Sequence, residues 1–414
     1  MADYHAKVAL GEALVPVGQL RFTRDGPRQY SSFAYDAGWI EDPRRFALSP
    51  DMPLDSGPYH HSSQQGEARD ALGGAFADAA PDSWGRRLLE RAYGNGLSEF
   101  EYLTLSDDAC RQGALRFLDD AGAVITGAAA DAVPRLIDLA AITAIARAYE
   151  QGNEISAEDL QALAGAGGSG GARPKANVRE GEHLWLAKFT SVLDQQPVER
   201  VEVATLRLAK LCGIAVPEVR LVLADTPWPV ALLRRFDRQG NARIPYISAR
   251  TALAKRGTEL GSYTEIVDFM RGHAADPARD FRELYRRLIF TILVSNKDDH
   301  LKNHGFLYVG NGQWRLSPMF DVNPAPDRNP HLETAILEGG AHDRSIALAL
   351  AACEFFEIDD GDARTMIRDL AERVAGSWRE AFRETGVTGA QARSFEPAFE
   401  HDEGKLALSF SIHI

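Results

Sequence analysis

The chain has 414 residues, of which 45% are hydrophobic and 25% charged, and its formal net charge at pH 7 is −13. This length is too great for one ordinary core and predicts two to three structural units. The acidic balance argues against broad, non-specific binding to nucleic acid, but not against a basic partner or against DNA contacts made by another subunit.

Targeting and redox signals point to the cytoplasm. We find no apolar run of about 18 residues that would predict a membrane span, and the N-terminus lacks the basic-then-apolar pattern of a signal peptide. The three cysteines, Cys110, Cys212 and Cys353, lie far apart without CxxC spacing. We therefore expect a protein of a reducing compartment, with no disulfide framework and no zinc knuckle.

Residues 1–125 predict a small α/β module. The runs "VPVGQLRF" and "YSSFAYD" read as strands joined by the turn "TRDGPR". The segment "PDSWGRRLLERAYG" opens with proline, carries an apolar stripe and stops at glycine, which is typical of a helix.

Residues 126–245 predict a β-rich lobe. Two Ala-rich helical segments lead into "GGSGGARPK", followed by a hairpin of "PKANVR" and "HLWLAKF". The amphipathic helix "VERVEVATLRLAKLCGI" and the strands "VPEVRLVLAD" and "PVALLRRFDR" complete it.

Residues 246–414 predict a mostly helical lobe, with helices in "YTEIVDFMRGHA", in "DFRELYRRLIFTILVSN" and in a C-terminal pair around 345–356 and 361–384. The expected fold class is therefore α+β, with an N-terminal α/β subdomain, a β-rich lobe and a helical lobe.

The Gly-rich stretch is a candidate phosphate-binding loop. Four of its residues directly precede the predicted hairpin: Gly168, Ser169, Gly170 and Gly171. Such a loop lets backbone N–H groups approach phosphate oxygens closely. The stretch fits neither the P-loop nor the Rossmann pattern, and a plain Gly/Ser linker is the alternative. Arg173 and Lys175 beside it favour phosphate binding.

A lysine and a glutamate follow the loop in the order that kinases use. Lys188 lies on the second strand of the hairpin, where a kinase places the lysine that contacts the nucleotide's phosphates. A glutamate on the next helix would orient that lysine; Glu202 is preferred over Glu199 because of its place on the apolar helix. The competing interpretations are a solvated edge lysine and a surface glutamate.

The stretch "NKDDHLKN" holds the candidate catalytic loop. Kinases place an aspartate, which receives the substrate's hydroxyl proton, five positions before an asparagine that holds a metal ion. Asp298 and Asn303 have this spacing, whereas Asp299 has no such partner and is predicted to be structural. Lys302 would neutralise charge on the transferring phosphoryl group, and His300 would orient the loop. A solvated helix end and a metal-hydrolase site are the weaker alternatives.

The stretch "WRLSPMFDVNPAP" provides a second carboxylate. We expect a strand here that ends in Phe320-Asp321. Asp321 then lies where a kinase places its Mg²⁺-binding aspartate, and Mg²⁺ needs few protein ligands, so Asp321 and Asn303 suffice.

The ordered set of motifs resembles the HipA family of bacterial serine/threonine kinase toxins. The resemblance rests on "VGQL…FAYDAGWI", "GAL", "GGARPK", "LAKF", "RRFDR", "NKDDHLKNHGF" and "LSPMFDV", which span residues 15–325. It implies a two-lobed, protein-kinase-like fold with an added N-terminal subdomain, and it implies ATP and Mg²⁺ as cofactors.

The resemblance also implies residue roles and partners. Asp298 would be the catalytic base, Asn303 and Asp321 would hold Mg²⁺, and Lys188 would contact the ATP phosphates. The backbone around Arg234 and Phe236 would face adenine. A helix-turn-helix antitoxin similar to HipB would neutralise the toxin and supply its DNA contacts, and the substrate would be a protein such as an aminoacyl-tRNA synthetase.

Two other functions stay open from the residues alone. A small-molecule phosphotransferase of the same fold would keep every one of these positions, and a non-catalytic module could bind a partner through the same surface.

Overall fold

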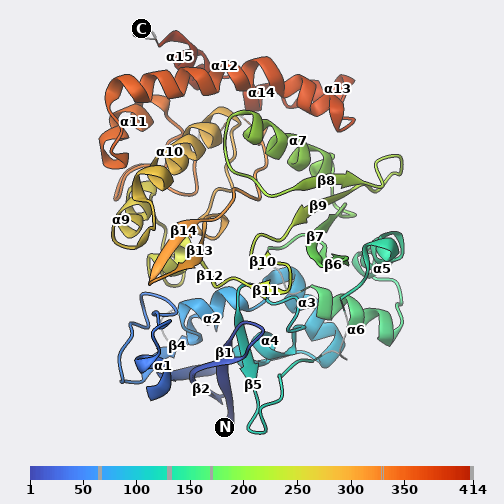
Figure 1. Cartoon of the computed structure of the whole chain (residues 1–414). Coiled ribbons are helices and arrows are strands. Elements are labelled where there is room, and N and C mark those ends of the chain that lie inside the picture. Colours follow the sequence, from blue (N-terminus) through green and yellow to red (C-terminus); the bar gives the residue numbers. More distant parts are fainter. Residues whose placement is uncertain (64–67, 128–132, 168–170, 328, 330, 411–414) are drawn as a thin grey trace. The chain divides into compact units, whose positions relative to one another are not determined.

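The computed structural model describes residues 1–63, 68–127, 133–167, 171–327, 329 and 331–410 (Figure 1). The chain divides into two units. The first comprises Met1–Leu193, Leu232–Glu259 and Leu307–Gly312, and the second comprises Asp194–Ala231, Leu260–Phe306 and Gln313–Ile414. The three-part division expected from the sequence stays a prediction.

The first unit begins with a five-stranded antiparallel sheet in the order β4-β3-β2-β1-β5. Its strands are β1 (Ala2–Leu10), β2 (Val15–Asp25), β3 (Arg28–Tyr35), β4 (Tyr59–Ser62) and β5 (Leu115–Leu118). The central hairpin of β2 and β3 is the one predicted from the sequence. The strands around it add the edges.

Aromatic rings fix two helices to this sheet. The helices of this part of the first unit are α1 (Ala37–Glu41), α2 (Gly74–Ala79), α3 (Ser83–Tyr93), α4 (Glu99–Leu105), α5 (Leu139–Glu150) and α6 (Ala157–Ala166). Phe33 of β3 meets Phe76 of α2 with ring centroids 5.1 Å apart, and Phe22 of β2 lies 6.0 Å from Phe100 of α4. All four rings are buried, and each contributes about 1.5–3 kcal/mol through burial. They form the core that fixes the sheet to its helices.

The rest of the first unit carries a second hairpin, made by β6 and β7. Its elements include β6 (Lys175–Glu180), β7 (His183–Phe189), β10 (Arg238–Gln239), β11 (Ala242–Arg243), β12 (Tyr246–Ser248) and α8 (Ala249–Ala252). The predicted hairpin of β6 and β7 is confirmed, and it turns at Gly181, whose φ is +59°. A left-handed residue at this position is what a tight hairpin turn requires.

Two further sheets have the strand orders β6-β7-β9-β8 and β12-β13-β14. Their remaining strands are β8 (Val219–Val222), β9 (Val230–Arg234), β13 (Gly305–Gly310) and β14 (Gln313–Leu316).

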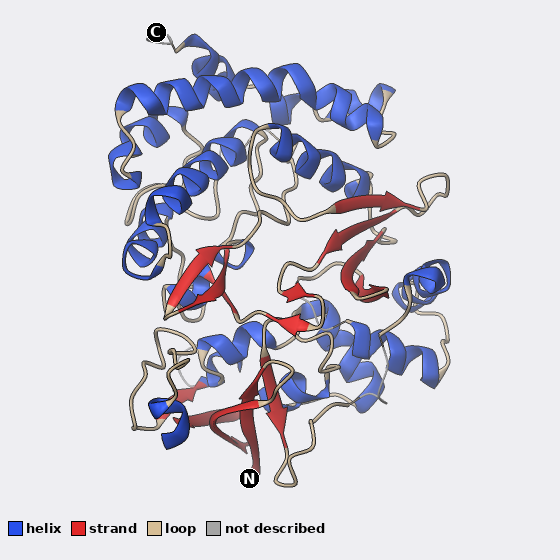
Figure 2. Cartoon of the chain, in the orientation of Figure 1, coloured by secondary structure: helices blue, strands red, loops and turns tan. Residues whose placement is uncertain are grey.

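The second unit is mostly helical. Its helices are α7 (Val198–Leu211), α9 (Tyr263–His273), α10 (Pro277–Leu293), α11 (Ile346–Ala351), α12 (Asp360–Glu384), α13 (Gly389–Ser394), α14 (Glu396–Phe399) and α15 (Asp402–Ser409). Figure 2 shows that helices make up most of the C-terminal segment. The central helix, α10, starts at the cap Asp276, whose carboxylate accepts from Arg279 N at 3.2 Å. Within the described part of the chain, no helix has both the length and the apolar character to cross a membrane.

Candidate active site

The candidate catalytic loop begins where α10 ends, at a serine in the left-handed conformation. Ser295 has a φ of +55° and is fully buried. The first two backbone N–H groups of the loop donate back to carbonyls in the last turn of α10, which is how a helix closes on a left-handed residue. Glycine usually occupies this position, so the serine needs other support. Its Oγ donates to Ala398 O at 2.8 Å and accepts from the Arg344 guanidinium.

The structure brings Asp298 and Asn303 together in one tight loop. Asn303 Nδ2 donates to the backbone oxygen of Asp298 at 2.7 Å, and Asn303 N donates to His300 O at 2.8 Å. Leu301 is buried and starts the short 3₁₀ turn Leu301–Asn303. Asn303 is buried, whereas Asp298 is exposed. This hydrogen bond uses Nδ2 of Asn303 and not its amide oxygen. The amide oxygen is the atom that would bind a metal ion.

Asp299 is a structural residue, as its spacing predicts. Its buried carboxylate accepts from the Tyr263 hydroxyl and contacts His304 Nε2 at 3.3 Å, and Thr334 Oγ1 donates to its backbone oxygen at 2.6 Å. Burial raises the pKa of Asp299, but the positive charge and hydrogen bond of His304 and the hydrogen bond of Tyr263 outweigh it and lower the pKa overall. This carboxylate therefore anchors the loop and is withdrawn from solvent.

Backbone pairing ties Asp321 to the start of the catalytic loop. Ala325 N donates to Ser295 O at 3.1 Å, and Asn323 N donates to Asn296 Oδ1 at 3.3 Å. Asp321 itself is left-handed, with a φ of +57°, and its Oδ1 accepts from Asn323 Nδ2 at 3.3 Å. Asp321 and the catalytic loop therefore belong to one hydrogen-bonded segment pair.

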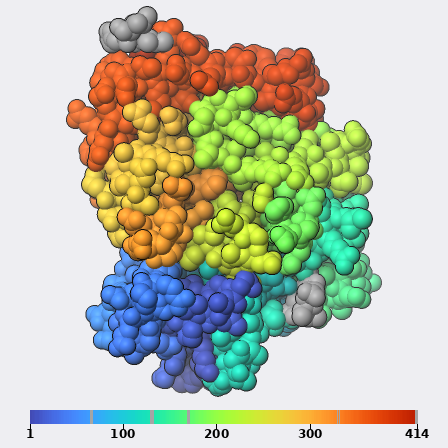
Figure 3. All heavy atoms as spheres, in the orientation of Figure 1, coloured from blue at the N-terminus to red at the C-terminus, as the bar shows by residue number. Residues whose placement is uncertain are grey.

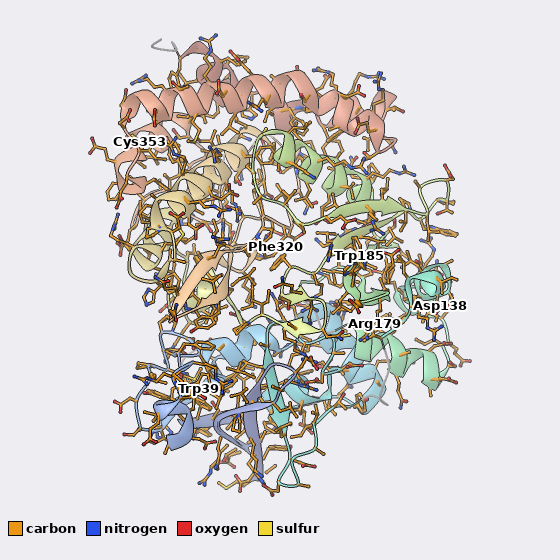
Figure 4. All side chains as sticks on the ribbon, in the orientation of Figure 1. Trp39, Asp138, Arg179, Trp185, Phe320 and Cys353 are labelled. Atoms are coloured by element: carbon orange, nitrogen blue, oxygen red, sulfur yellow. The ribbon has the colours of Figure 1, made fainter. Side chains whose placement is uncertain are left out.

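The strand expected before Asp321 is shorter than predicted. It ends at Leu316, the last residue of β14, and does not reach Phe320-Asp321. Ser317 N still donates to a β13 carbonyl at 2.7 Å, but Pro318 has no N–H with which to continue the pairing. Figure 2 draws the following segment as a loop, and Figure 4 labels Phe320 on it.

The oxygen atoms around Asp321 fit a Mg²⁺ ion. Asn323 Oδ1 is buried and has no hydrogen-bond partner, beside the carboxylate that its own Nδ2 contacts. Within the described residues no group of three or more His, Cys, Asp or Glu side chains is placed to hold a metal ion. Mg²⁺ does not need such a group, because it keeps several waters and takes one or two carboxylates together with substrate phosphates. Asn323 was not predicted, and its place two residues after Asp321 is the only signal the sequence holds.

The other two predicted members of the loop have different surroundings. Lys302 is partly buried. His300 is also partly buried, and its Nδ1 is a buried atom without a hydrogen-bond partner. His300 contributes a favourable charge to Asp299, which fits the predicted orienting role, although the role itself stays a prediction.

In the first unit, two lysines lie directly opposite each other in the β6–β7 hairpin. Lys175 of β6 pairs with Lys188 of β7, and both are buried, at 3% and 5% exposure. Opposite residues of an antiparallel pair share one face of the hairpin. Two ammonium groups on one face are a candidate contact for an anion.

The Gly-rich loop is held to α3 at its C-terminal end. Gly168, Ser169 and Gly170 lie outside the described residues. Gly171 is described: its φ is +99°, and its N–H donates to Asp82 Oδ2 at 2.8 Å. Trp84 Nε1 donates to Lys175 O at 2.8 Å. A Cβ on Gly171 would displace the Lys175 ammonium, and the positive φ of this residue disfavours any side chain.

The predicted adenine-facing segment contains a buried ion pair. Arg234 contacts His183 Nδ1 at 3.1 Å, and Phe236 packs 6.2 Å from the ring of Tyr246. Between them, Arg235 donates from both Nε and a terminal nitrogen to the Asp237 carboxylate. Burial raises the pKa of Asp237, but its arginine neighbours lower it overall. We did not predict this ion pair from the sequence, because a structural ion pair follows no motif spacing.

Glu202 and Glu199 are both buried on α7, at 2% and 1% exposure. The competing interpretation of Glu202 as a surface glutamate is therefore wrong. Glu202 and Lys188 belong to different units, and the pairing of their side chains stays a prediction.

Comparisons with known proteins identify the family of the chain. The model of the HipA-like C-terminal domain matches residues 167–378, and that of the HipA N-terminal domain matches residues 6–117. The chain is 27% identical over 346 residues to the "Putative kinase Y4mE" of Sinorhizobium fredii, covering 77% of this chain and 78% of that protein. A "Putative kinase" of Haemophilus influenzae is 30% identical over 143 residues, which cover 30% of this chain and only 42% of that protein.

A solved structure shares the fold. HipA of Shewanella oneidensis MR-1, determined in complex with HipB and its operator DNA, aligns over 98% of this chain and 96% of its own, with a TM-score of 0.67 and 16% identity. The predicted α+β, kinase-like fold is confirmed. Because the C-terminal domain model alone matches half of the sequence and the N-terminal model covers most of the remaining start, the chain belongs to the HipA family.

Proposed function

We propose that this chain is an ATP- and Mg²⁺-dependent serine/threonine protein kinase and the toxin of a type II toxin–antitoxin system. The observation that carries the proposal is the loop in which buried Asn303 holds the backbone of exposed Asp298. One residue of the pair is fixed where a metal ligand must be fixed. The other faces solvent, where it can meet a substrate hydroxyl.

In the proposed reaction, Asp298 accepts the proton of the substrate hydroxyl. The hydroxyl oxygen forms a bond to the γ-phosphorus of ATP as the bond from that phosphorus to the bridging oxygen breaks, and ADP leaves. Mg²⁺, held by Asn303 and Asp321, would offset negative charge on the phosphate oxygens. The fixed loop would align the Asp298 carboxylate with the substrate hydroxyl. Such positioning supplies much of the catalysis of phosphoryl transfer.

The first unit would supply the nucleotide contacts. Two buried ammonium groups, Lys175 and Lys188, match the charge of a polyphosphate and would be stabilised by it. Gly171, which admits the Lys175 ammonium against its backbone, belongs to the same contact. In this proposal Glu202 orients Lys188, and Lys302 neutralises the transferring group.

Transfer of labelled phosphate tests the chemistry. We expect purified chain to transfer the γ-phosphate of ATP to a protein, and Asp298→Asn to lower the rate about 10²–10⁴-fold, the usual contribution of a general base. Asp369→Asn is the matched control, because Asp369 is an exposed aspartate on α12. Equal rates for Asp298→Asn and the control would remove Asp298 as the base.

The labelled product identifies the acceptor. A labelled protein band in cell lysate supports the protein kinase. Labelled small molecules without such a band would instead support a small-molecule phosphotransferase. A translation factor such as an aminoacyl-tRNA synthetase is the protein we expect, because its phosphorylation would arrest growth.

Growth and co-purification test the toxin role. Expression of the chain should arrest growth, and Asp321→Ala should relieve the arrest. Full arrest by Asp321→Ala would favour a non-catalytic binding module. The relative from Shewanella was solved with HipB and operator DNA, so we expect a helix-turn-helix protein from a neighbouring reading frame to co-purify and to carry any DNA contact.

A further inference from the structure

The first turn of α3 meets the Gly-rich loop at Gly167 and at Gly171. A Cβ on Gly85 would come within 2.5 Å of Gly167 O, so the backbones approach each other closely only because Gly85 has no side chain. Gly171 donates its N–H to Asp82 Oδ2 at 2.8 Å, and its carbonyl accepts from Trp84 N at 3.3 Å. Figure 1 shows α3 beside α6, the helix that leads into the loop. One helix turn therefore contacts the loop on both sides.

The carboxylate of Asp82 serves this loop and not its own helix. Asp82 occupies the N-cap position of α3, where an aspartate normally accepts a hydrogen bond from the first helical N–H groups. Its side chain makes no such cap bond. One oxygen accepts from Gly171 N instead, and the other contacts the guanidinium of Arg69, from the 3₁₀ turn Ala68–Ala71. The helix thus forgoes its own cap bond in favour of a bond to the loop.

The same turn fixes the backbone that leads to Lys175. Arg87 Nη2 donates to Ala172 O at 3.0 Å, and Trp84 Nε1 donates to Lys175 O at 2.8 Å. The Lys175 ammonium lies against the α-carbon of Gly171, where a Cβ would displace it. The place of this ammonium therefore depends on the backbone that α3 holds.

These bonds join the two domains that the family models distinguish. α3 lies in the stretch that matches the HipA N-terminal domain, whereas Gly171 and Lys175 lie in the stretch that matches the C-terminal domain. Both stretches meet within the first unit. The N-terminal domain therefore supplies contacts to a loop that the C-terminal domain carries.

We propose that Asp82 is a positioning residue of the nucleotide site, which holds Gly171, and through it the Lys175 ammonium, in place for the phosphates of ATP. The inference rests on the proposed kinase function and adds to it a role for the N-terminal domain. The carboxylate would repel phosphate, so it acts through Gly171, whose N–H it already occupies. A loop that is ordered before binding loses less freedom when the ligand binds, which raises affinity.

Hydrogen exchange of the full chain without nucleotide tests the contact itself. Asp82→Ala removes the acceptor of the Gly171 N–H. Exchange of that amide should become about 10- to 100-fold faster, which is the value of a hydrogen bond to a charged group. Asp82→Asn keeps an oxygen that can accept this bond but loses the charge, so its rate should be intermediate. Equal Gly171 rates in Asp82→Ala and the unchanged chain would overturn the proposal.

Asp138→Ala is the matched control. Asp138, labelled in Figure 4, is an exposed aspartate at the N-cap of α5, and its carboxylate also makes no cap hydrogen bond. Figure 3 shows the teal atoms around α5 next to the green atoms of the β6–β7 hairpin, where Arg179 N donates to Pro134 O at 2.8 Å. The control therefore loses an N-cap carboxylate beside the same hairpin without losing a bond to the loop. It should leave Gly171 exchange unchanged.

Steady-state kinetics and calorimetric titration with ATP and Mg²⁺ separate positioning from folding. Asp82→Ala should raise the KM and the dissociation constant for ATP about tenfold, and Asp138→Ala should change neither. The kcat of Asp82→Ala should stay nearly unchanged, because the proposed base Asp298 belongs to the second unit. Faster Gly171 exchange with an unchanged KM would make Asp82 a purely structural residue and refute the positioning role. Failure of the unchanged chain to bind ATP would instead refute the proposed function and, with it, the nucleotide role of Asp82.

Discussion

The left-handed serine at the start of the catalytic loop makes a sharp stability prediction. Replacing Ser295 by alanine removes the hydroxyl that donates to Ala398 O and accepts from Arg344. Each lost hydrogen bond costs about 1 kcal/mol, and the buried groups left unpaired raise the total to about 2–4 kcal/mol. Replacing Ser295 by glycine loses the same two bonds. Glycine, however, avoids the penalty of about 1–2 kcal/mol that a Cβ suffers at a φ of +55°.

The comparison of the two variants is the test. Glycine also adds about 0.4–1 kcal/mol of backbone entropy to the unfolded chain. Ser295→Gly should therefore be more stable than Ser295→Ala by about 0.5–1 kcal/mol. The chain has two units, so the measurement is hydrogen exchange of the α10 end and the loop after it, which reports local opening free energy rather than one global value. Ser295→Ala at least as protected as Ser295→Gly would refute the argument from backbone conformation.

Three other changes have defined outcomes. Burial lowers the pKa of His401 to about 4, so the buried neutral ring is fully compatible with the fold above pH ~6.5. As pH falls toward 4, up to about 3 kcal/mol of folding free energy is lost. His401→Gln should therefore flatten the pH dependence of hydrogen exchange in α15. Gly171→Ala should raise the KM for ATP more than it lowers kcat, because the new Cβ displaces the Lys175 ammonium; an unchanged KM in steady-state kinetics would mean that the loop is only a linker. Gly85→Ala should lower the thermal midpoint, with about 1–3 kcal/mol of overpacking, since its Cβ would come within 2.5 Å of Gly167 O.

Elements with a strong hydrophobic period were predictable from the sequence, and contacts between distant residues were not. The hairpin that carries Lys188 and the helix that leads to the catalytic loop follow from local patterns. β14 ends early because Pro318 has no N–H to continue the pairing. The sequence shows this proline, but the apolar run around it led us to predict a longer strand. The burial of Glu199 on α7 could not be read locally, because it depends on what packs around the helix.

Among the site residues, too, those with a local sequence pattern were predicted and those that depend on distant contacts were not. Asp298 and Asn303 were found because their spacing is local. Asn323 was missed because the burial of its unpartnered Oδ1 depends on tertiary packing that its place two residues after Asp321 does not reveal. The Arg235–Asp237 pair was missed because it is partly fixed by the N-terminal module, where Cys110 O accepts from Arg235 at 2.7 Å.

Some unfavourable features of the chain lie at the residues that the proposed reaction uses. Two of the non-glycine residues with positive φ, Ser295 and Asp321, flank the candidate catalytic segment. Asn323 Oδ1 is buried there without a partner. Each of these features costs on the order of 1–3 kcal/mol and persists only because surrounding contacts impose it. A metal ion bound beside Asp321 would relieve the cost of the unpartnered Asn323 oxygen, so we expect this segment to be stabilised when the proposed Mg²⁺ binds.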